Sequence, residues 1–588
     1  MQNPPPQPDT GSPQPAPPTQ GTGGTPSATR GGQPGLGAAV RAASLVTLAS
    51  RFAGMLRDVL VVQVFGATAL ASAFAAAFQI PNLFRRLFGE GALSAAFIPE
   101  YAVTAKRSQE DADRLSSYIL TRLAWITAAI TIVAELIMLV LLVTLPPNPD
   151  REISLRLMMM MFPFMPAICI AAILSAMLQV HGRFGASMSG AFFVNLFIVS
   201  VCVFCLITGR TNNPVVAYVL CIATVLSGFT QCIWFSRLLR QYSAWRPDNG
   251  EASAAARKML KNFVPVMVGL GGLQISSFLD LSITMYPIWV GKHILGFDYP
   301  LDEKSNIILR STSLIFQFPL GVFGAAVATA AFPMLARAAD NGGLFLDTVR
   351  RGLRLSIFIG LPASIGLILV REDVTRVLFS LSSKRGFDEA ALARSADVLL
   401  AFAPSVWAFA LNQLLTRVFY AKGDTITPVR VSAMMVGVSF VLSFIGMWFL
   451  REAALGLAAT ITAVVQTIIL SAIAKKRFCP PGEPILDGPT RRSIARVTAA
   501  VLVMAAIVLL TQNLWPLETT EKTNELTGVT ETVVSTSRWM ILLRMACYVG
   551  LGAGAYAGEA VYSRSPELAW LTSRGNKAKG QYRDLVVE

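Results

Sequence analysis

Long apolar segments dominate this chain and constrain its fold more than any other feature. A membrane-spanning helix needs about 20 apolar residues, and fourteen segments approach or exceed that length. These segments contain Leu, Ala, Val, Ile and Phe without two-residue alternation, which predicts helices rather than barrel strands. The expected fold class is an all-α integral membrane protein with about 14 transmembrane helices, over residues 38–65, 69–103, 117–145, 153–181, 187–209, 214–236, 260–292, 305–338, 349–371, 394–421, 427–450, 454–474, 493–514 and 538–562.

Composition agrees with a polytopic membrane protein. The 588 residues are 53% hydrophobic and only 14% charged, with a mean hydropathy of +0.55, which is too apolar for a soluble chain of this size. The net charge of +15 resides mainly in short loops between spans. Such loops are explained by the positive-inside rule, so no nucleic-acid partner is expected. With both termini cytoplasmic, the basic loops fall inside, except the predicted outer loop that carries Arg371, Arg376, Lys384 and Arg385.

The spans divide into two groups of six. A basic segment that contains Trp245 and Arg246 separates them, and many transporters consist of two such lobes around a central site. Two further spans follow Pro480 and Pro481. We therefore expect a disordered Pro/Gly-rich cytoplasmic tail over 1–37, an N-lobe over 38–240, a linker over 241–259, a C-lobe over 260–475, two extra helices within 476–562 and a cytoplasmic C-terminal tail over 563–588.

Signatures of catalysis and metal binding are lacking in the sequence. The seven cysteines are scattered without disulfide or metal-ligand spacing, and His181 and His293 are too far apart in the chain for a zinc site. There is no phosphate-cradling Gly-Lys-Ser/Thr loop and no nucleophile, histidine and acid arrangement. The sequence therefore predicts a transporter that uses no cofactor, not an enzyme.

Charged residues interrupt the first two spans. Arg51, Arg57, Arg85, Arg86 and Glu90 lie among long apolar runs, where an ionised side chain normally faces a protein interior or a watery cavity. Arginine stays protonated and forms forked hydrogen bonds with phosphate oxygens, so this group predicts an anion-binding cavity. The alternative is that arginines snorkel to the membrane edge, and for Arg57, with Asp58 beside it, a helix-anchoring pair is an equal interpretation.

The order of these residues resembles the MurJ (MviN) family of lipid II flippases. The resemblance rests on Ser50-Arg51-Phe-Ala-Gly-Met-Leu-Arg57-Asp58, on Phe65-Gly66-Ala67, and on the block from Ala77-Phe78 through Pro81-Asn82, Arg85-Arg86 and Glu90-Gly91 to Pro99. Later blocks are Phe318-Pro319 with Gly321 and Gly324, Phe332-Pro333, Leu361-Pro362-Ala363, and Phe419-Tyr420-Ala421 with Asp424 and Thr427-Pro428. The resemblance covers roughly residues 40 to 560.

This resemblance implies a member of the multidrug, oligosaccharidyl-lipid and polysaccharide exporter superfamily. It implies two lobes with alternating access and two extra helices that line a lipid groove. The expected activity is transfer of lipid II from the inner to the outer leaflet of the bacterial inner membrane, with the cavity arginines on its diphosphate. Expected partners are lipid II or a similar polyprenyl-diphosphate-linked sugar, membrane lipids and proteins of cell-wall synthesis, and the expected oligomeric state is a monomer.

Two positions depart from the family pattern. An acid common after Phe-Gly-Ala is replaced by Ser72, and the run that usually carries an arginine in the eighth helix reads Thr312-Ser313-Leu314. Arg310 lies one helical turn before Leu314 on nearly the same face. It either supplies the missing charge to the substrate site or is an interfacial arginine near the preceding loop.

Asp280 is an isolated carboxyl within the seventh span. The interpretations are an ion-coupling site, a salt bridge to a cavity arginine, or a neutral buried carboxyl. Ser439, Ser443 and Thr460 offer only hydroxyls as further sodium ligands. Coupling to the membrane potential is equally compatible with the sequence.

Two alternatives to lipid II transport follow from the same residues. The chain could export another polyprenyl-diphosphate-linked sugar or a drug, although the arginines favour an anionic lipid over a cationic drug. It could also be a diverged cell-wall scaffold without transport, which the changes at Ser72 and Leu314 favour and the retained arginines oppose.

Overall fold

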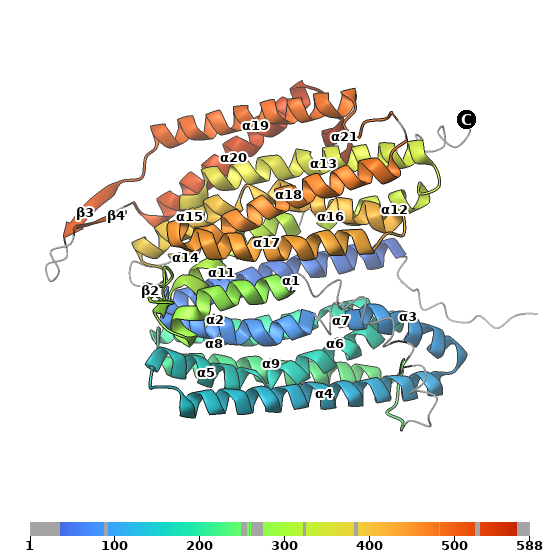
Figure 1. The fold of residues 1–588 in the computed structure, drawn as a ribbon, viewed down its shortest axis with the longest axis vertical. Helices are drawn as coiled ribbons and strands as arrows, with labels where there is room; N and C mark the ends of the chain where they lie inside the picture. The colour runs from blue at the N-terminus through green and yellow to red at the C-terminus, as the bar shows by residue number, and fades with distance from the viewer. Residues whose placement is uncertain are drawn as a thin grey trace, which may run out of the picture.

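The computed structural model describes residues 36–86, 92–247, 256, 257, 259, 274–321, 325–380, 386–480, 482–523, 530–534 and 536–572. Helices make up most of this part of the chain and run along one common direction (Figure 1). Nine of the described helical segments are long and apolar enough to cross a membrane, and a tenth is a helix pair bent by 42°. The predicted helical membrane fold is confirmed.

The N-lobe is built from nine helices within the described residues. Asparagine and serine or threonine side chains cap several of them, as at Thr68, Ser108 and Asn148, where each side chain accepts a hydrogen bond from a free backbone N–H of the first turn. The helices are α1 (Leu36–Phe65), α2 (Ala69–Arg85), α3 (Ala92–Arg107), α4 (Gln109–Thr144), α5 (Pro149–Met161), α6 (Phe164–Val180), α7 (Phe184–Met188), α8 (Gly190–Thr208) and α9 (Pro214–Leu239).

In the described part of the C-lobe, residues 274–289 are the first helical segment. A short antiparallel hairpin follows, in which Ile294 pairs with Phe297. Its elements are β1 (His293–Ile294), β2 (Phe297–Asp298), α11 (Ser305–Pro319), α12 (Ala325–Arg337), α13 (Gly342–Leu369), α14 (Arg371–Phe379), α15 (Glu389–Phe402), α16 (Ser405–Ala421), α17 (Ile426–Leu450) and α18 (Ala453–Phe478).

The two extra helices pack on the outside of the C-lobe (Figure 1). They are α19 (Gly488–Leu514) and α20 (Arg538–Tyr562), joined by the antiparallel strands β3 (Thr519–Thr523) and β4 (Thr530–Val534) and followed by α21 (Pro566–Thr572). A buried Arg544 on α20 faces Asp373 on α14 at 3.5 Å, and Gln512 donates to the carbonyl of Leu369.

Several spans expected as single helices are pairs. The span expected over 153–181 is α5 and α6 with Pro163 between them, and that over 394–421 is α15 and α16 with Pro404 between them. Proline cannot donate the backbone hydrogen bond that a continuous helix needs. Within the span expected over 69–103, the structure describes α2 up to Arg85 and α3 from Ala92 onward.

The lobes meet near the end of the bundle that carries both β-hairpins (Figure 1). Gln63 of α1 donates to the carbonyl of Leu378 at 3.0 Å, and Trp289 donates to the hydroxyl of Ser154 at 3.0 Å. Gly66, in the left-handed region at φ +64°, lies so near Gly386 that an added Cβ would be 2.7 Å from its carbonyl oxygen. We call this end the outer end.

Candidate functional site

A cavity with charged walls lies between α1, α2, α8 and α11. It therefore has walls from both lobes, since α11 belongs to the C-lobe. Its lining residues are Arg57, Asp58, Val61, Phe74, Ala75, Phe78, Ile198, Ile307, Arg310, Ser311 and Leu314. Here we call it the central cavity.

Arg57 enters the central cavity from α1 as half of an ion pair. Its Nε and Nη2 donate to the two carboxylate oxygens of Asp58 at 2.9 and 3.0 Å, and Nη1 donates to Oδ1 of Asn195 at 3.2 Å. Both charged side chains are about 15% exposed. The pair contributes no net charge to the cavity, although the guanidinium still presents a face to the ring of Phe78 at 4.9 Å.

Arg310 enters the same cavity from α11. Its Nη1 donates to Oε1 of Gln79 at 3.3 Å, and its guanidinium lies 5.6 Å from the centre of the Phe78 ring. Within the described part of the chain, no carboxylate forms an ion pair with it. Arg310 therefore adds one positive charge that the cavity wall does not neutralise, one turn from Leu314, the residue at the position where the family pattern places its arginine.

The other predicted arginines lie nearer the opposite end of the bundle. Arg85 is in the last turn of α2, two turns beyond Phe78, and its Nε donates to Asn82 at 2.7 Å. Arg86 follows it and is exposed. Neither lines the central cavity. Arg51 belongs to α1, but its side chain lies outside the described part of the chain, as does the whole of Glu90.

Asp280 lies on the helix over 274–289 and is partly buried. Among described residues, its carboxylate makes no hydrogen bond or ion pair. The hydroxyl of Thr460 donates to the carbonyl of Ala401 at 2.6 Å, and the hydroxyl of Ser443 is buried without a partner in the described chain. No group of three His, Cys, Asp or Glu residues suited to a metal ion occurs in the described chain.

Ser72, which replaces the acid of the family pattern, lies at the contact between the lobes. Its carbonyl accepts from Nδ2 of Asn306 at 3.0 Å, and its hydroxyl accepts from the backbone N–H of Ile307 at 3.3 Å. The side chain is fully buried. Ser72 thus joins α2 to the first turn of α11 as a neutral group.

Three residues that contact the two cavity arginines were not predicted from the sequence as site residues. They are Phe78, which lines the central cavity, and Gln79 and Asn195, which hydrogen-bond Arg310 and Arg57. Phe78 and Gln79 are part of the motif that carried the family resemblance, and Asn195 is a lone amide within the apolar run of α8. A buried amide in such a run is a signal for a polar partner, and here that partner is Arg57.

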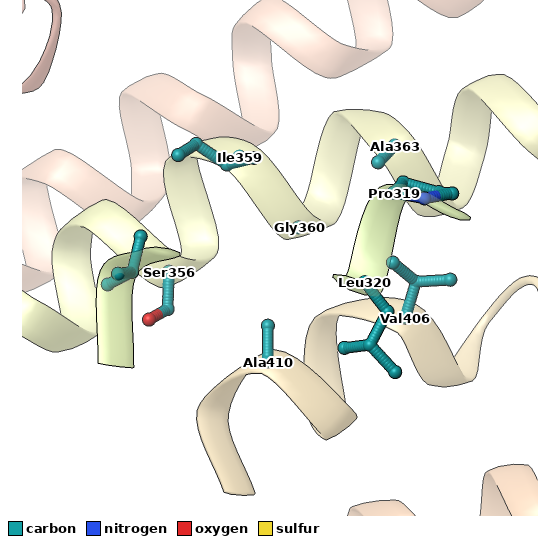
Figure 2. Close-up of a pocket in the computed structure, with 9 residues that line it drawn as sticks. Pro319, Leu320, Ser356, Ile359, Gly360, Ala363, Val406 and Ala410 are labelled. Atoms are coloured by element: carbon teal, nitrogen blue, oxygen red, sulfur yellow. The ribbon is translucent and has the colours of Figure 1, made fainter. Parts of the chain in front are cut away.

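A second cavity lies within the C-lobe, between α11, α12, α13 and α16, and no charged side chain lines it. Figure 2 shows the hydroxyl of Ser356 beside hydrocarbon walls. This hydroxyl is buried and makes no hydrogen bond within the described chain. Without a cation the cavity does not suit an anionic group. Its lining residues are Pro319, Leu320, Val327, Ser356, Ile359, Gly360, Ala363, Val406 and Ala410.

The fold and the central cavity define a class of protein, the two-lobed multi-pass membrane transporters. Solved structures of that class resemble this one. "Lipid II flippase MurJ, inward closed conformation" matches with a TM-score of 0.69 at 18% identity, over 89% of this chain and 98% of that one. An inward-facing multidrug resistance MATE family transporter of the MOP superfamily matches with a TM-score of 0.56 at 14% identity, over 74% of this chain and 99% of that one.

Sequence relatives give the family. The model of the family "Lipid II flippase MurJ" matches residues 61–523. A probable lipid II flippase MurJ of Rhizobium tropici is 30% identical over 471 residues, 79% of this chain and 84% of the relative. One of Vibrio cholerae is 28% identical over 495 residues, 81% and 88% of the two chains. This chain belongs to the MurJ lipid II flippase family, so it is a multi-pass inner-membrane transporter and not an enzyme.

Proposed function

We propose that this protein transfers lipid II across the bacterial inner membrane by alternating access, with Arg57 and Arg310 binding the diphosphate of the lipid. Family membership supports the substrate. The single observation that carries the site is that one arginine from each lobe reaches the central cavity. An anion that joins both guanidiniums therefore also joins the lobes.

The charges of the central cavity suit a diphosphate. Asp58 pairs directly with Arg57, whereas the direct contacts of Arg310 within the described chain are with a neutral amide and a ring. An uncompensated cation of this kind favours an anion, and a phosphate oxygen can accept forked hydrogen bonds from a guanidinium. When the diphosphate arrives, it would compete with Asp58 for Arg57. The carboxylate thus provides an exchangeable partner and keeps the arginine from holding its ligand permanently.

Arg51, Arg85, Arg86 and Glu90 complete the proposed substrate path. Arg85 and Arg86 lie beyond Phe78 along α2, away from the outer end. In this position they would attract the anionic headgroup before it reaches Arg57 and Arg310. Arg51 lies on α1, also further from the outer end than Arg57.

The contact between the lobes supports alternating access. Gln63, Ser72 and Trp289 close the outer end through hydrogen bonds. The volume of the central cavity is only about 20 Å³, which is far too small for the sugar and peptide of lipid II. The cavity must therefore widen to admit the headgroup from one side, and the outer contact must break to release it on the other.

The proposal also includes the orientation of the chain in the membrane. The start of α1 and the end of α20 lie at the same end of the bundle, opposite both β-hairpins (Figure 1). Basic loops favour the cytoplasm, so we place both chain termini inside and the hairpins outside.

We retain Asp280 as a candidate for coupling to an ion, because its carboxylate has no partner among the described residues.

Complementation of a bacterium depleted of its resident lipid II flippase tests the proposal. The wild-type chain should restore wall synthesis, Arg310→Gln should not, and Arg310→Lys should restore it weakly because it keeps the charge but loses the fork. Arg417→Gln is the matched control, since Arg417 lies on α16 over the ring of Phe332 at 5.6 Å and does not line the cavity.

Membrane insertion of every variant is verified by immunoblot. Restoration by Arg310→Gln at the wild-type level would refute the proposed site. If the inserted wild-type chain fails to complement and yet rescues a strain that lacks the exporter of another lipid-linked sugar, the substrate is that other lipid and not lipid II.

A further inference from the structure

The ring of Phe78 lies beside both cavity arginines. The guanidinium of Arg57 is 4.9 Å from the ring centre and that of Arg310 is 5.6 Å from it. Phe78 is on α2, whereas the arginines come from α1 and α11, and the ring is only 6% exposed. A single buried aromatic side chain therefore contacts a cation of the N-lobe and a cation of the C-lobe.

Two guanidiniums that share one ring repel each other. This repulsion is stronger at a partly buried site than in bulk water, and it falls with the distance between the two charges. Asp58 pairs with Arg57 and offsets part of this cost. Arg310 forms no ion pair within the described chain. Besides the attraction of the Asp58 charge at longer range, the negative face of the Phe78 ring and the amide oxygen of Gln79 hold it here.

We propose that Phe78 is a positioning residue of the diphosphate site, whose ring holds the arginines of the two lobes together before an anion joins them. This inference rests on the proposed function. Because the ring carries no formal charge, it does not compete with phosphate as a second carboxylate would. It lowers the cost of bringing two cations together, so less of the substrate's binding energy is lost to arranging them.

Phe74 provides a matched control on the same helix. It lines the same cavity one turn before Phe78 and is 3% exposed. Its ring packs against Phe65 at 5.9 Å, and no guanidinium of the described chain lies over it. Replacing either phenylalanine by leucine removes an aromatic ring from the same cavity wall, but only one replacement removes a contact with arginine.

The experiment measures binding of farnesyl diphosphate, a short soluble polyprenyl diphosphate, to the purified full-length protein in nanodiscs. The variants are Phe78→Leu, Phe78→Tyr and Phe74→Leu. Desolvated cation–π contacts are worth about 1–2 kcal/mol, so Phe78→Leu should weaken binding by about 5- to 30-fold. Phe78→Tyr keeps the ring and should bind within about twofold of wild type, since tyrosine also supports cation–π contacts. Phe74→Leu should weaken binding clearly less than Phe78→Leu does, because no guanidinium of the described chain lies over the Phe74 ring.

A double-mutant cycle separates positioning from packing. If Phe78 acts through Arg310, the loss caused by Phe78→Leu should shrink in an Arg310→Gln background, whereas a packing defect should persist there. Size-exclusion profiles and thermal midpoints identify misfolded variants, and Phe78→Met replaces Phe78→Leu if the latter does not fold.

The inference is wrong if Phe78→Leu binds as tightly as wild type, if Phe74→Leu loses as much affinity, or if the two losses of the cycle simply add. Each of these outcomes leaves the proposed function intact, provided that the wild-type protein binds the diphosphate. A wild-type protein that binds no polyprenyl diphosphate refutes the proposed function itself, and with it the role assigned to Phe78.

Discussion

A methyl group added at Gly66 should loosen the contact between the two lobes at the outer end. Gly66 follows α1 with φ at +64°, and an added Cβ would lie 2.7 Å from the carbonyl oxygen of Gly386. Ordinary contact begins at 3.4 Å, so the lobes must separate locally by about 3.4 − 2.7 = 0.7 Å. Carbonyl and Cβ are parts of the backbone or fixed to it, so neither can turn away as a long side chain can.

The size of the effect follows from the bonds that this separation endangers. The hydrogen bond from Gln63 to Leu378 is 3.0 Å long and joins the same two segments. A further 0.7 Å would bring it beyond hydrogen-bond range, at a net cost of about 1 kcal/mol. Steric overlap that remains between the added Cβ and Gly386 adds to this cost, so the closed contact should lose about 1–2 kcal/mol in total. This loss raises the ratio of open to closed molecules by about 5- to 30-fold.

The assay is a spin-label distance measurement between Arg210→Cys and Ala390→Cys. Both positions are exposed, and they lie at the outer ends of the N-lobe and the C-lobe. The three partly buried native cysteines, Cys232, Cys479 and Cys547, are replaced by serine so that they take no label. Gly66→Ala should increase the population at the longer distance.

Gly66→Asn distinguishes steric overlap from backbone strain. Asparagine also carries a Cβ, but it tolerates the left-handed region better than alanine. Overlap with Gly386 predicts that both variants open the outer end equally and that only Gly66→Ala loses additional thermal stability. If neither variant changes the distance distribution, the steric argument is refuted. If only Gly66→Ala changes it, strain and not overlap is the cause.

Three further predictions concern stability. Ser356→Ala should raise the thermal midpoint, because a buried hydroxyl without a partner in the described chain costs about 1–3 kcal/mol; an unchanged or lower midpoint would indicate a hidden partner. Glu567→Gln should destabilise the protein by about 3 kcal/mol in chemical denaturation, because it removes the buried carboxylate that pairs with Arg354 at 2.6 Å and leaves that cation poorly compensated. Glu483→Gln is the near-neutral control, because the carboxylate of Glu483, which pairs with Arg350, is itself exposed. Burial would raise the pKa of Asp302, but the guanidiniums of Arg394 and Arg451 outweigh it and lower the pKa to about 2. This stabilisation is present above the ordinary pKa near 4 and is lost as the pH falls through 2. The thermal midpoint of Asp302→Asn should therefore change less than that of wild type between pH 4 and pH 2. Thermal midpoints of the two proteins that fall in parallel over this range would contradict the assignment.

Local sequence features predicted most of the long helices. Their length and apolarity locate α9, α17 and α18 closely, because lipid demands that each span satisfy its own backbone hydrogen bonds. The hairpin of β3 and β4 was expected only as part of an outer loop. Its strands are five residues long and lie outside the apolar segments, so hydropathy gives no signal for them.

The site was less accessible to prediction from the sequence. Helical spacing placed Arg310 on the face of Leu314, and the structure has both residues in the central cavity. Helical spacing could not show that Arg85 and Arg86 do not line that cavity, since this depends on where α2 crosses the other helices. It also could not show that Phe78 meets Arg310, because that contact spans more than 200 residues and exists only after the lobes pack.

The contrast between bonds within and between lobes has a mechanistic consequence. In the C-lobe, Arg394 joins Asp302 and Glu452 in a largely buried ion network. Between the lobes, by contrast, the hydrogen bonds of Gln63, Ser72 and Trp289 involve neutral groups, and no ion pair between described residues joins the two lobes. Breaking a buried ion pair costs about 3–5 kcal/mol, whereas each neutral hydrogen bond contributes about 0.5–1.5 kcal/mol.

A contact made of neutral bonds can therefore open without stranding a charge at either face. The charged groups shared by the lobes lie in the central cavity, where Arg57 and Arg310 face one ring. If the proposed site is correct, a dianionic ligand placed there should change the energy of closure more than a single neutral hydrogen bond at the outer end does. We infer that the balance between open and closed lobes is set by occupancy of the cavity, as a transporter that moves only with its substrate requires.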